Sequence, residues 1–223
     1  MWIEKYKPKN LDEVVGHEKL KAVIRKCIER GDIPHFLFYG LTGTGKTLIA
    51  ELIGHELLKE NFNDNFIEIN ASDDRTVQKM REVVVNAITH STINGYIRVI
   101  LLDEMDGVLQ PAQELLRRPM EKSHKTRFIL TANDVDSIID PIKNRCMCFE
   151  FKPLKKEDII KKLTFIARNE NLKITKTQLE VIAKQSKGSM RQAIIELEKI
   201  SMIEDSEEEL LRKYMRRGKN GDR

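Results

Sequence analysis

The chain has 223 residues, of which 40% are hydrophobic and 33% are charged, enough for one large domain or for one medium and one small domain with a highly charged surface. No apolar run is long enough to span a membrane and the N-terminus lacks the apolar core of a signal peptide, so we expect a cytoplasmic protein, or a nuclear one. The formal net charge of +4 permits nucleic-acid binding but does not argue for it. The three cysteines do not form two paired clusters of metal ligands, so we expect them to be small residues buried near a strand rather than a zinc site.

The first part of the chain predicts a helix, a buried strand and a second helix. Apolar residues between 20 and 28 share one helical face, and Gly31 suits the end of that helix. The apolar run 35–39 predicts a strand, and 48–58 has helical spacing. Between them, residues 40–47 read Gly-Leu-Thr-Gly-Thr-Gly-Lys-Thr, which fits the pattern G-x-x-x-x-G-K-[ST] of a phosphate-binding loop.

A strand, a Gly-rich turn and a helix start are the context in which this loop binds phosphate. Glycines let backbone N–H groups close around phosphate oxygens, and the helix N-terminus favours negative charge. Lys46 would bridge the β- and γ-phosphates of a bound nucleotide, and Thr47 would give its hydroxyl to Mg²⁺. A chance lysine after a Gly-rich turn is the alternative, and the match at all four fixed positions argues against it. The loop residues expected around the nucleotide are Gly40, Leu41, Thr42, Gly43, Thr44, Gly45, Lys46, Thr47 and Leu48.

A strand that ends in two carboxylates follows at the expected distance. Residues 66–70 alternate as a strand, and 77–87 supply the apolar face of a helix. Residues 97–104 read as a buried strand ending in Asp103 and Glu104, which is the Walker B pattern. Asp103 would hold the Mg²⁺ and Glu104 would polarise the attacking water. An acidic cap on an ordinary strand is the alternative, and the position one βαβ repeat after the loop favours Walker B.

The rest of the chain predicts two more strands and then only helices. Pro111 suits the first turn of a helix that runs through 115–118. Residues 127–133 predict a strand whose last residue, Asn133, could align the water beside Glu104. A short strand at 147–151 precedes helical patterns near 157–169, 176–184 and 190–202. We therefore expect an α/β P-loop NTPase domain with a parallel sheet at 1–152, a small helical lid domain at 153–203 and a charged C-terminal tail at 204–223.

Ordered motifs across residues 2–203 resemble one family, the small subunit of replication factor C, a sliding-clamp loader of the AAA+ class. Beside the loop and Walker B, the motifs are W-I-E-K-Y-K-P at 2–8, V-G-H at 15–17, N-A-S-D-D-R at 70–75, L-D-E-M-D at 102–106, Q-E-L-L-R-R-P-M-E at 113–121, N-R-C at 144–146 and G-S-M-R-Q-A at 188–193.

The resemblance implies an ATPase, stimulated by DNA and clamp, that uses ATP and Mg²⁺ to open a clamp and load it on primer–template DNA during replication. It implies a ring-like pentamer with other clamp-loader subunits and no membrane association. Within this family, Asn133 is sensor one, Arg145 is the arginine finger that reaches into a neighbouring subunit, and Arg191 is sensor two. By the same resemblance, Tyr6 and Pro8 lie in the segment that borders the adenine, and Val15 and Gly16 are further nucleotide-binding residues. Arg75, Lys79 and Arg81 would contact the DNA backbone, in a salt-sensitive way that is largely blind to sequence.

Several positions depart from the family pattern. Asn144 replaces a serine beside Arg145, Val85 replaces a frequent lysine, and we expect Pro119 to bend the helix that carries Arg117 and Arg118. The family continues beyond the lid into a collar domain for which this chain has no room, so a truncated form and a naturally short, for instance viral, relative both stay open. We expect weak, ATP-dependent self-association and no clamp loading by the chain alone.

Two other functions stay open beside the clamp-loader ATPase. The first is a non-hydrolysing, ATP-gated subunit of a mixed assembly, and the intact Lys46, Asp103 and Glu104 argue against it. The second is another AAA+ replication protein, such as a helicase loader. The N-terminal segment 2–8 and the N-R-C element at 144–146 favour the clamp loader.

Overall fold

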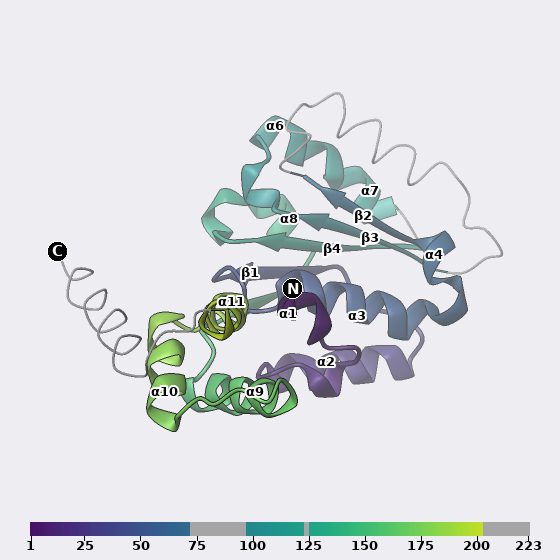
Figure 1. Ribbon diagram of the computed structural model, residues 1–223. Helices are drawn as coiled ribbons and strands as arrows, with labels where there is room; N and C mark the ends of the chain where they lie inside the picture. Colours follow the sequence, from purple (N-terminus) through teal and green to yellow (C-terminus); the bar gives the residue numbers. More distant parts are fainter. Residues whose placement is uncertain (72–96, 123–124, 203–223) are drawn as a thin grey trace. The chain divides into compact units, whose positions relative to one another are not determined.

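The computed structural model describes residues 1–71, 97–122 and 125–202 (Figure 1). Contacts divide the described residues into two compact units, one formed by those between 17 and 151 and the other by residues 1–16 together with 152–202. We call them the α/β unit and the helical unit, and each is described by itself. The predicted helix at 77–87, the tail at 204–223 and the DNA candidates Arg75, Lys79 and Arg81 lie outside the described residues.

The α/β unit is built on a five-stranded sheet in which every pairing is parallel, with strand order β2-β3-β4-β1-β5. This confirms the parallel α/β fold expected from the sequence. Because β4 lies between β1 and β3, the carboxyl ends of these three strands are neighbours although they are far apart in the chain (Figure 1). The strands are β1 Phe36–Gly40, β2 Phe66–Asn70, β3 Arg98–Asp103, β4 Thr126–Ala132 and β5 Met147–Phe151.

The central strands are buried on both faces, which is why they read as continuous apolar runs. On one face, Leu37, Ile100 and Leu130 share a core with Leu116 and Ile142 from the helical segments. Helix α3 contacts β3 and β4, and α2 packs against α3. The helices are α2 Glu18–Glu29, α3 Lys46–Leu58, α4 Phe62–Asn65, α6 Gln110–Gln113, α7 Arg117–Lys122 and α8 Asp140–Lys143, with 3₁₀ turns at Lys59–Asn61, Met105–Gly107, Glu114–Leu116 and Val135–Ser137.

The helix expected to run from Pro111 through 115–118 is divided in the structure. Helix α6 ends at Gln113, a 3₁₀ turn covers Glu114–Leu116, and α7 begins at Arg117. Pro119 cannot donate a backbone hydrogen bond, and its ring crowds the carbonyl of Leu115 four residues earlier. A tighter turn at that carbonyl is the accommodation expected of a proline inside a helix.

The prediction of buried cysteines is wrong at one position. Cys27 and Cys146 are partly buried, whereas Cys148 is exposed. Cys148 lies on β5, which pairs on one side only with another described strand, so less of its surface is covered.

The helical unit packs three helices around a small core. They are α9 Lys156–Asn169, α10 Lys176–Gln185 and α11 Met190–Ser201, and Ile159, Leu163, Ile182 and Leu197 are among their buried residues. A capping box between the Thr175 and Gln178 side chains and backbone fixes the start of α10. The Ser189 hydroxyl accepts from the backbone N–H of Gln192 at the start of α11.

The N-terminal residues belong to this helical unit rather than to the sheet. Helix α1 Trp2–Lys5 contacts α11, and Trp2, Ile3 and Tyr6 pack against the core of the three helices. A 3₁₀ turn at Leu11–Glu13 follows. The contacts thus group residues 1–16 with the segment after 152, whereas the sequence-based boundaries place them with the sheet.

Candidate active site

The Gly-rich loop connects β1 to α3 and depends on its glycines. Gly40, Gly43 and Gly45 have φ values of 123°, 76° and 105°, which L side chains rarely adopt. A Cβ at Gly40 would also lie 2.5 Å from the carbonyl oxygen of Phe151 on the adjacent β5. The sheet therefore requires glycine where the loop leaves β1, and the turn delivers the chain to the N-terminus of α3, whose first N–H groups lack helical acceptors.

Lys46, the first residue of α3, folds back over the loop. Its Nζ donates to the carbonyl oxygens of Gly40 at 2.7 Å and Leu41 at 3.2 Å, and to Asn133 Oδ1 at 3.0 Å. Its exposed fraction is only 8%. The loop thus holds a nearly buried ammonium group against its own carbonyls, next to the end of β4, where an anion bound by the loop would meet it.

Thr47 and the Walker B aspartate are joined directly. Thr47 Oγ1 donates to Asp103 Oδ1 at 2.9 Å and to Oδ2 at 3.1 Å. Thr131 on β4 also donates its hydroxyl to Asp103, and it accepts from the backbone N–H of Glu104 at 3.1 Å. Thr131 therefore fixes both the carboxylate of Asp103 and the backbone of the next residue.

Glu104 turns away from the sheet at the end of β3. Its φ of 56° places it in the left-handed region, and its side chain is exposed. Within the described ranges its carboxylate makes no hydrogen bond or ion pair. The structure brings it to the same edge of the sheet as Asp103 and leaves it accessible to water, as a general base requires.

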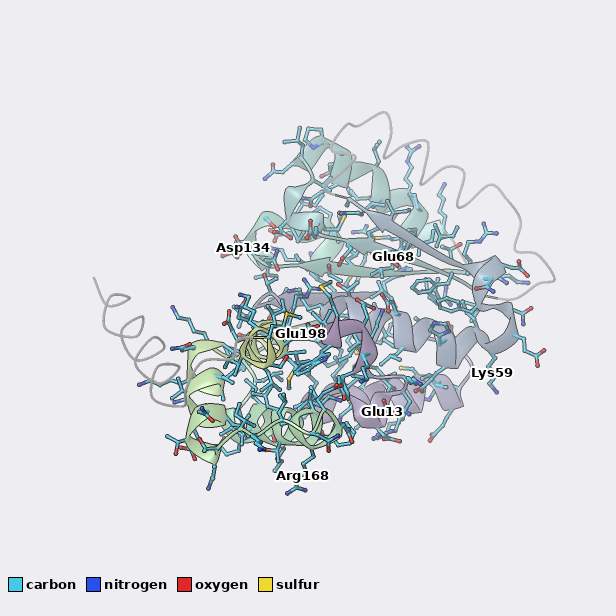
Figure 2. The ribbon with its side chains drawn as sticks, viewed as in Figure 1. Glu13, Lys59, Glu68, Asp134, Arg168 and Glu198 are labelled. Atoms are coloured by element: carbon cyan, nitrogen blue, oxygen red, sulfur yellow. The ribbon has the colours of Figure 1, made fainter. Side chains whose placement is uncertain are left out.

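Asn133 connects the Gly-rich loop to the segment that follows β3. Its Oδ1 accepts from Lys46 Nζ and, at 3.1 Å, from Thr42 Oγ1. Its backbone N–H and its Nδ2 donate to the two carboxylate oxygens of Asp106, at 3.0 and 3.2 Å. The next residue, Asp134, is labelled in Figure 2 and marks this end of the strands. Asp106 therefore orients the Asn133 amide so that Asn133 Oδ1 points to Lys46.

Sequence reasoning did not include Asp106, Thr131 or His17 among the site residues. The Nε2 of His17 lies 3.0 Å from the carbonyl oxygen of Thr44 in the loop, and its ring packs on Phe151 at 4.3 Å between centroids. Burial lowers the pKa of His17. Its place in the V-G-H motif and the place of Asp106 in L-D-E-M-D were the available signals, but neither pattern says which partner the side chain meets.

Arg145 follows α8 and lies against its own chain. Its Nη1 donates to the carbonyl oxygen of Pro141 at 2.5 Å, and Nη2 pairs with the carboxylate of Glu121. Its side chain is 24% exposed. The structure thus places Arg145 at the surface of the α/β unit, and its action on a neighbouring subunit stays a prediction.

The remaining predicted site residues belong to the helical unit. The Tyr6 hydroxyl donates to Glu170, and its ring meets Phe165 edge-on at 6.2 Å. Gly16 has a φ of 76°, and Arg191 is exposed at the second position of α11. The structure brings together Lys46, Thr47, Asp103 and Asn133 within one unit, and a role in nucleotide binding stays a prediction for Tyr6, Pro8, Val15, Gly16 and Arg191.

Comparisons with known proteins agree with this geometry. The model of the AAA family, ATPases associated with various cellular activities, matches residues 36–154, and the model of the RCF1/5-like AAA+ ATPase lid domain matches residues 161–202. No described helix is both long and apolar enough to cross a membrane.

The sequence relatives confirm the resemblance to replication factor C small subunits. The chain is 43% identical to the one from Staphylothermus marinus over 196 residues, which are 87% of this chain and 60% of the relative. It is 43% identical to the one from Archaeoglobus fulgidus over 205 residues, 91% of this chain and 64% of the relative. The chain thus spans about three fifths of the length of these relatives.

Among solved structures, the RuvB Holliday junction branch migration motor of Thermotoga maritima aligns with a TM-score of 0.74. The alignment covers 95% of this chain and 72% of RuvB at 21% identity. At that identity the likeness supports the fold alone.

Proposed function

The chain belongs to the AAA family of ATPases, and from that premise we propose that it binds and hydrolyses ATP as a subunit of a DNA sliding-clamp loader. The observation that carries the ATPase part is the convergence of Lys46, Thr47, Asp103 and Asn133 at the carboxyl edge of one parallel sheet. The naming of its relatives as replication factor C small subunits supports the clamp-loader part.

The proposed division of labour follows from the contacts. The N–H groups of the Gly-rich loop and the ammonium of Lys46 would hold the phosphates, since a preorganised cation costs little to align when the substrate binds. Glu104, the exposed carboxylate at the end of β3, would accept a proton from the attacking water. Asn133, held by Asp106, would fix the position of the γ-phosphate or of that water through its amide.

Mg²⁺ fits the donor set beside the loop. The Thr47 hydroxyl and both Asp103 oxygens lie within 3.1 Å of each other, and hydroxyl and carboxylate oxygens are the hard ligands that Mg²⁺ prefers. Thr47 and Asp103 would hold the ion. When bound, it would neutralise charge on the phosphate oxygens.

The proposed partners are primer–template DNA, a sliding clamp and other subunits of a ring-like clamp loader, at the nucleoid or in a nucleus. Arg75, Lys79 and Arg81 are the proposed contacts with the DNA backbone. The proposed domains are an ATP-binding domain at 1–152 and a lid at 153–203. Because residues 1–16 have their contacts within the helical unit, an ATP-binding domain that begins near His17 agrees better with the structure.

ATP turnover and ATP binding, measured separately, test the proposal. We expect Lys46→Ala to lose tight ATP binding, because it removes the cation of the loop, and Glu104→Gln to bind ATP but hydrolyse it at least a hundredfold more slowly. Equal ATP affinity in the wild type and in Lys46→Ala would contradict the loop assignment. A wild type that binds ATP but does not turn it over with primer–template DNA, clamp and partner subunits present would favour the non-hydrolysing alternative. Capture of a helicase instead of a sliding clamp would favour a helicase loader.

A further inference from the structure

Arg145 lies at the surface of the α/β unit with its guanidinium already held by its own chain. Nη1 donates to the Pro141 carbonyl oxygen and Nη2 pairs with Glu121, while Nε is buried and has no hydrogen-bond partner among the described residues. Its side chain is 24% exposed, compared with 48% for that of Glu121. About a quarter of the side-chain surface of Arg145 is thus exposed, while its Nε is buried.

Two contacts on different nitrogens decide where the group points. A guanidinium is planar, with five N–H donors in a rigid fork, so one bond on each terminal nitrogen fixes the plane of the group as well as its place. Glu121 comes from the last turn of α7 and Pro141 from α8, so two separate helices define that plane. Each terminal nitrogen keeps a second N–H that these two contacts do not use.

We propose that Glu121 is a positioning residue that aims Arg145, so that the unused N–H groups of its guanidinium are presented to the phosphates bound by a second subunit. The inference rests on the proposed function, because it assumes that Arg145 acts in trans. An ordinary surface ion pair would contribute little to stability and nothing to a neighbour's chemistry. Glu121 instead restricts the conformations of the Arg145 guanidinium, which in the proposed function must contact the transition state of ATP hydrolysis in another chain.

A mixing experiment separates the effect on a neighbour from any effect within the chain. The acceptor, whose ATP hydrolysis is measured, is Arg145→Ala, which keeps its own ATP site but cannot supply an arginine finger to a neighbour. The donor is Lys46→Ala, which cannot hold ATP but keeps Arg145. At protein concentrations that permit association, the donor should restore ATP hydrolysis in the acceptor. A donor that also carries Glu121→Ala should give a maximal rate about 10- to 100-fold lower, at an unchanged half-saturating donor concentration.

Two matched variants show whether aiming is the cause. A donor with Glu121→Gln keeps an acceptor oxygen at the same place and should recover most of the rate. A donor with Glu114→Ala should act like the unmodified donor. Glu114 is the matched control because it lies in the 3₁₀ turn immediately before α7, its side chain is 46% exposed, and it pairs with Arg117 rather than Arg145.

The outcomes distinguish this inference from the proposed function. If Arg145→Ala hydrolyses ATP at the wild-type rate under conditions where the wild type is assembled, the role of Arg145 in trans is wrong. If Arg145→Ala is impaired and the donors with and without Glu121→Ala restore it equally, the finger stands and the role of Glu121 is overturned.

A second measurement needs no assembly. In the chain labelled with ¹⁵N-arginine, the Arg145 Nε–Hε resonance, assigned by its loss in Arg145→Lys, should shift or broaden in Glu121→Ala and stay unchanged in Glu114→Ala. An Arg145 resonance that is the same in both variants would mean that Glu121 does not hold the guanidinium, and the inference would fail.

Discussion

Asn133 illustrates what one residue contributes when its neighbour fixes its direction. An asparagine amide can present either its oxygen or its nitrogen, and these two ends have opposite hydrogen-bonding character. The carboxylate of Asp106 accepts from both the backbone N–H and Nδ2 of Asn133, so the oxygen must face Lys46 and Thr42. The carboxylate of Asp106 thereby decides which end of the Asn133 amide the loop meets.

We therefore expect Asp106→Ala to lower the rate of ATP hydrolysis about tenfold with little change in ATP affinity, since the Asn133 amide is freed while the loop and Lys46 remain. Single-turnover hydrolysis and ATP titration measure the two effects. Asp136→Ala is the matched control, because Asp136 is an exposed aspartate near the same strand end. A wild-type rate in Asp106→Ala would show that Asn133 does not depend on it.

Two partly buried histidines are expected to make the stability of the α/β unit depend on pH. His35 accepts at Nδ1 from the backbone N–H of Phe128 and donates from Nε2 to the carbonyl oxygen of Met120, both at 3.0 Å. Only a neutral ring can accept at Nδ1, and burial lowers the pKa of both His35 and His17. A pKa below that of the unfolded chain means that the unfolded chain binds more protons, so stability rises with pH in this range.

We expect the free energy of unfolding of the α/β unit to be fully supported above about pH 6.5 and to fall as the pH drops below it, towards the lowered pKa values of the folded state. Urea unfolding between pH 5 and pH 8 measures this. In His35→Gln the slope of stability against pH should be smaller, because one of the two groups is gone. An equal slope in the variant and the wild type would exclude His35 as a source.

At the residue scale, the sequence could predict those site residues whose geometry is local. Lys46 and Thr47 are fixed by the loop itself, and Asp103 by its place at the end of an apolar strand. Thr131 and Asp106 could not be predicted. Thr131 meets Asp103, and Asp106 meets Asn133, because β4 pairs with β3, and no short pattern contains that pairing.

At the scale of the elements, the backbone just before α11 lies very close to the backbone just before α9, at Gly188. Gly188 has a φ of 88°, and a Cβ there would lie 2.4 Å from Cβ of Pro153 and 2.7 Å from its Cα. The backbone N–H of Leu154 also donates to the Gly188 carbonyl oxygen at 3.0 Å. Glycine thus lets the segment before α9 and the segment before α11 touch along their backbones.

Gly188→Ala should destabilise the helical unit by about 2 kcal/mol or more, because it adds overpacking to the strain of a positive φ. Gly31→Ala is the comparison, since Gly31 has a φ of 69° but nothing within 4 Å of the added Cβ. It should cost only about 1 kcal/mol. Denaturant unfolding of the two variants measures the difference, and equal losses would contradict the steric part of the argument.

Helices and strands were predictable where the spacing of apolar residues is regular. The distant segments against which they pack were not predictable. The predicted strands at 66–70 and 147–151 coincide with β2 and β5, and α9, α10 and α11 begin and end within one residue of the helical patterns. The packing of Trp2, Ile3 and Tyr6 on those helices joins positions more than 150 residues apart along the chain, and only the folded chain reveals it.

For the whole molecule, the question is whether ATP engages both units. The described geometry brings Lys46, Thr47, Asp103 and Asn133, the proposed contacts of the phosphates and Mg²⁺, together in the α/β unit. The resemblance assigns further contacts to Tyr6, Val15, Gly16 and Arg191, all in the helical unit. A ligand stabilises whatever it contacts only in the folded state, by about 2.7 kcal/mol at a concentration of one hundred times its Kd.

We therefore expect a saturating, non-hydrolysable ATP analogue to slow amide hydrogen exchange in both units of the wild type. In Arg191→Ala the protection should persist in α3 and β3 but diminish in α10 and α11, because the lost guanidinium is the strongest proposed link between the nucleotide and the helical unit. Lys199→Ala should behave like the wild type, since this cation lies on the same helix but pairs with Glu196 at 2.9 Å. If the analogue protects only the α/β unit of the wild type, the helical residues take no part in binding. The N-terminal segment would then act solely as packing for α9, α10 and α11, because its anchors Trp2, Ile3 and Tyr6 already lie on their core.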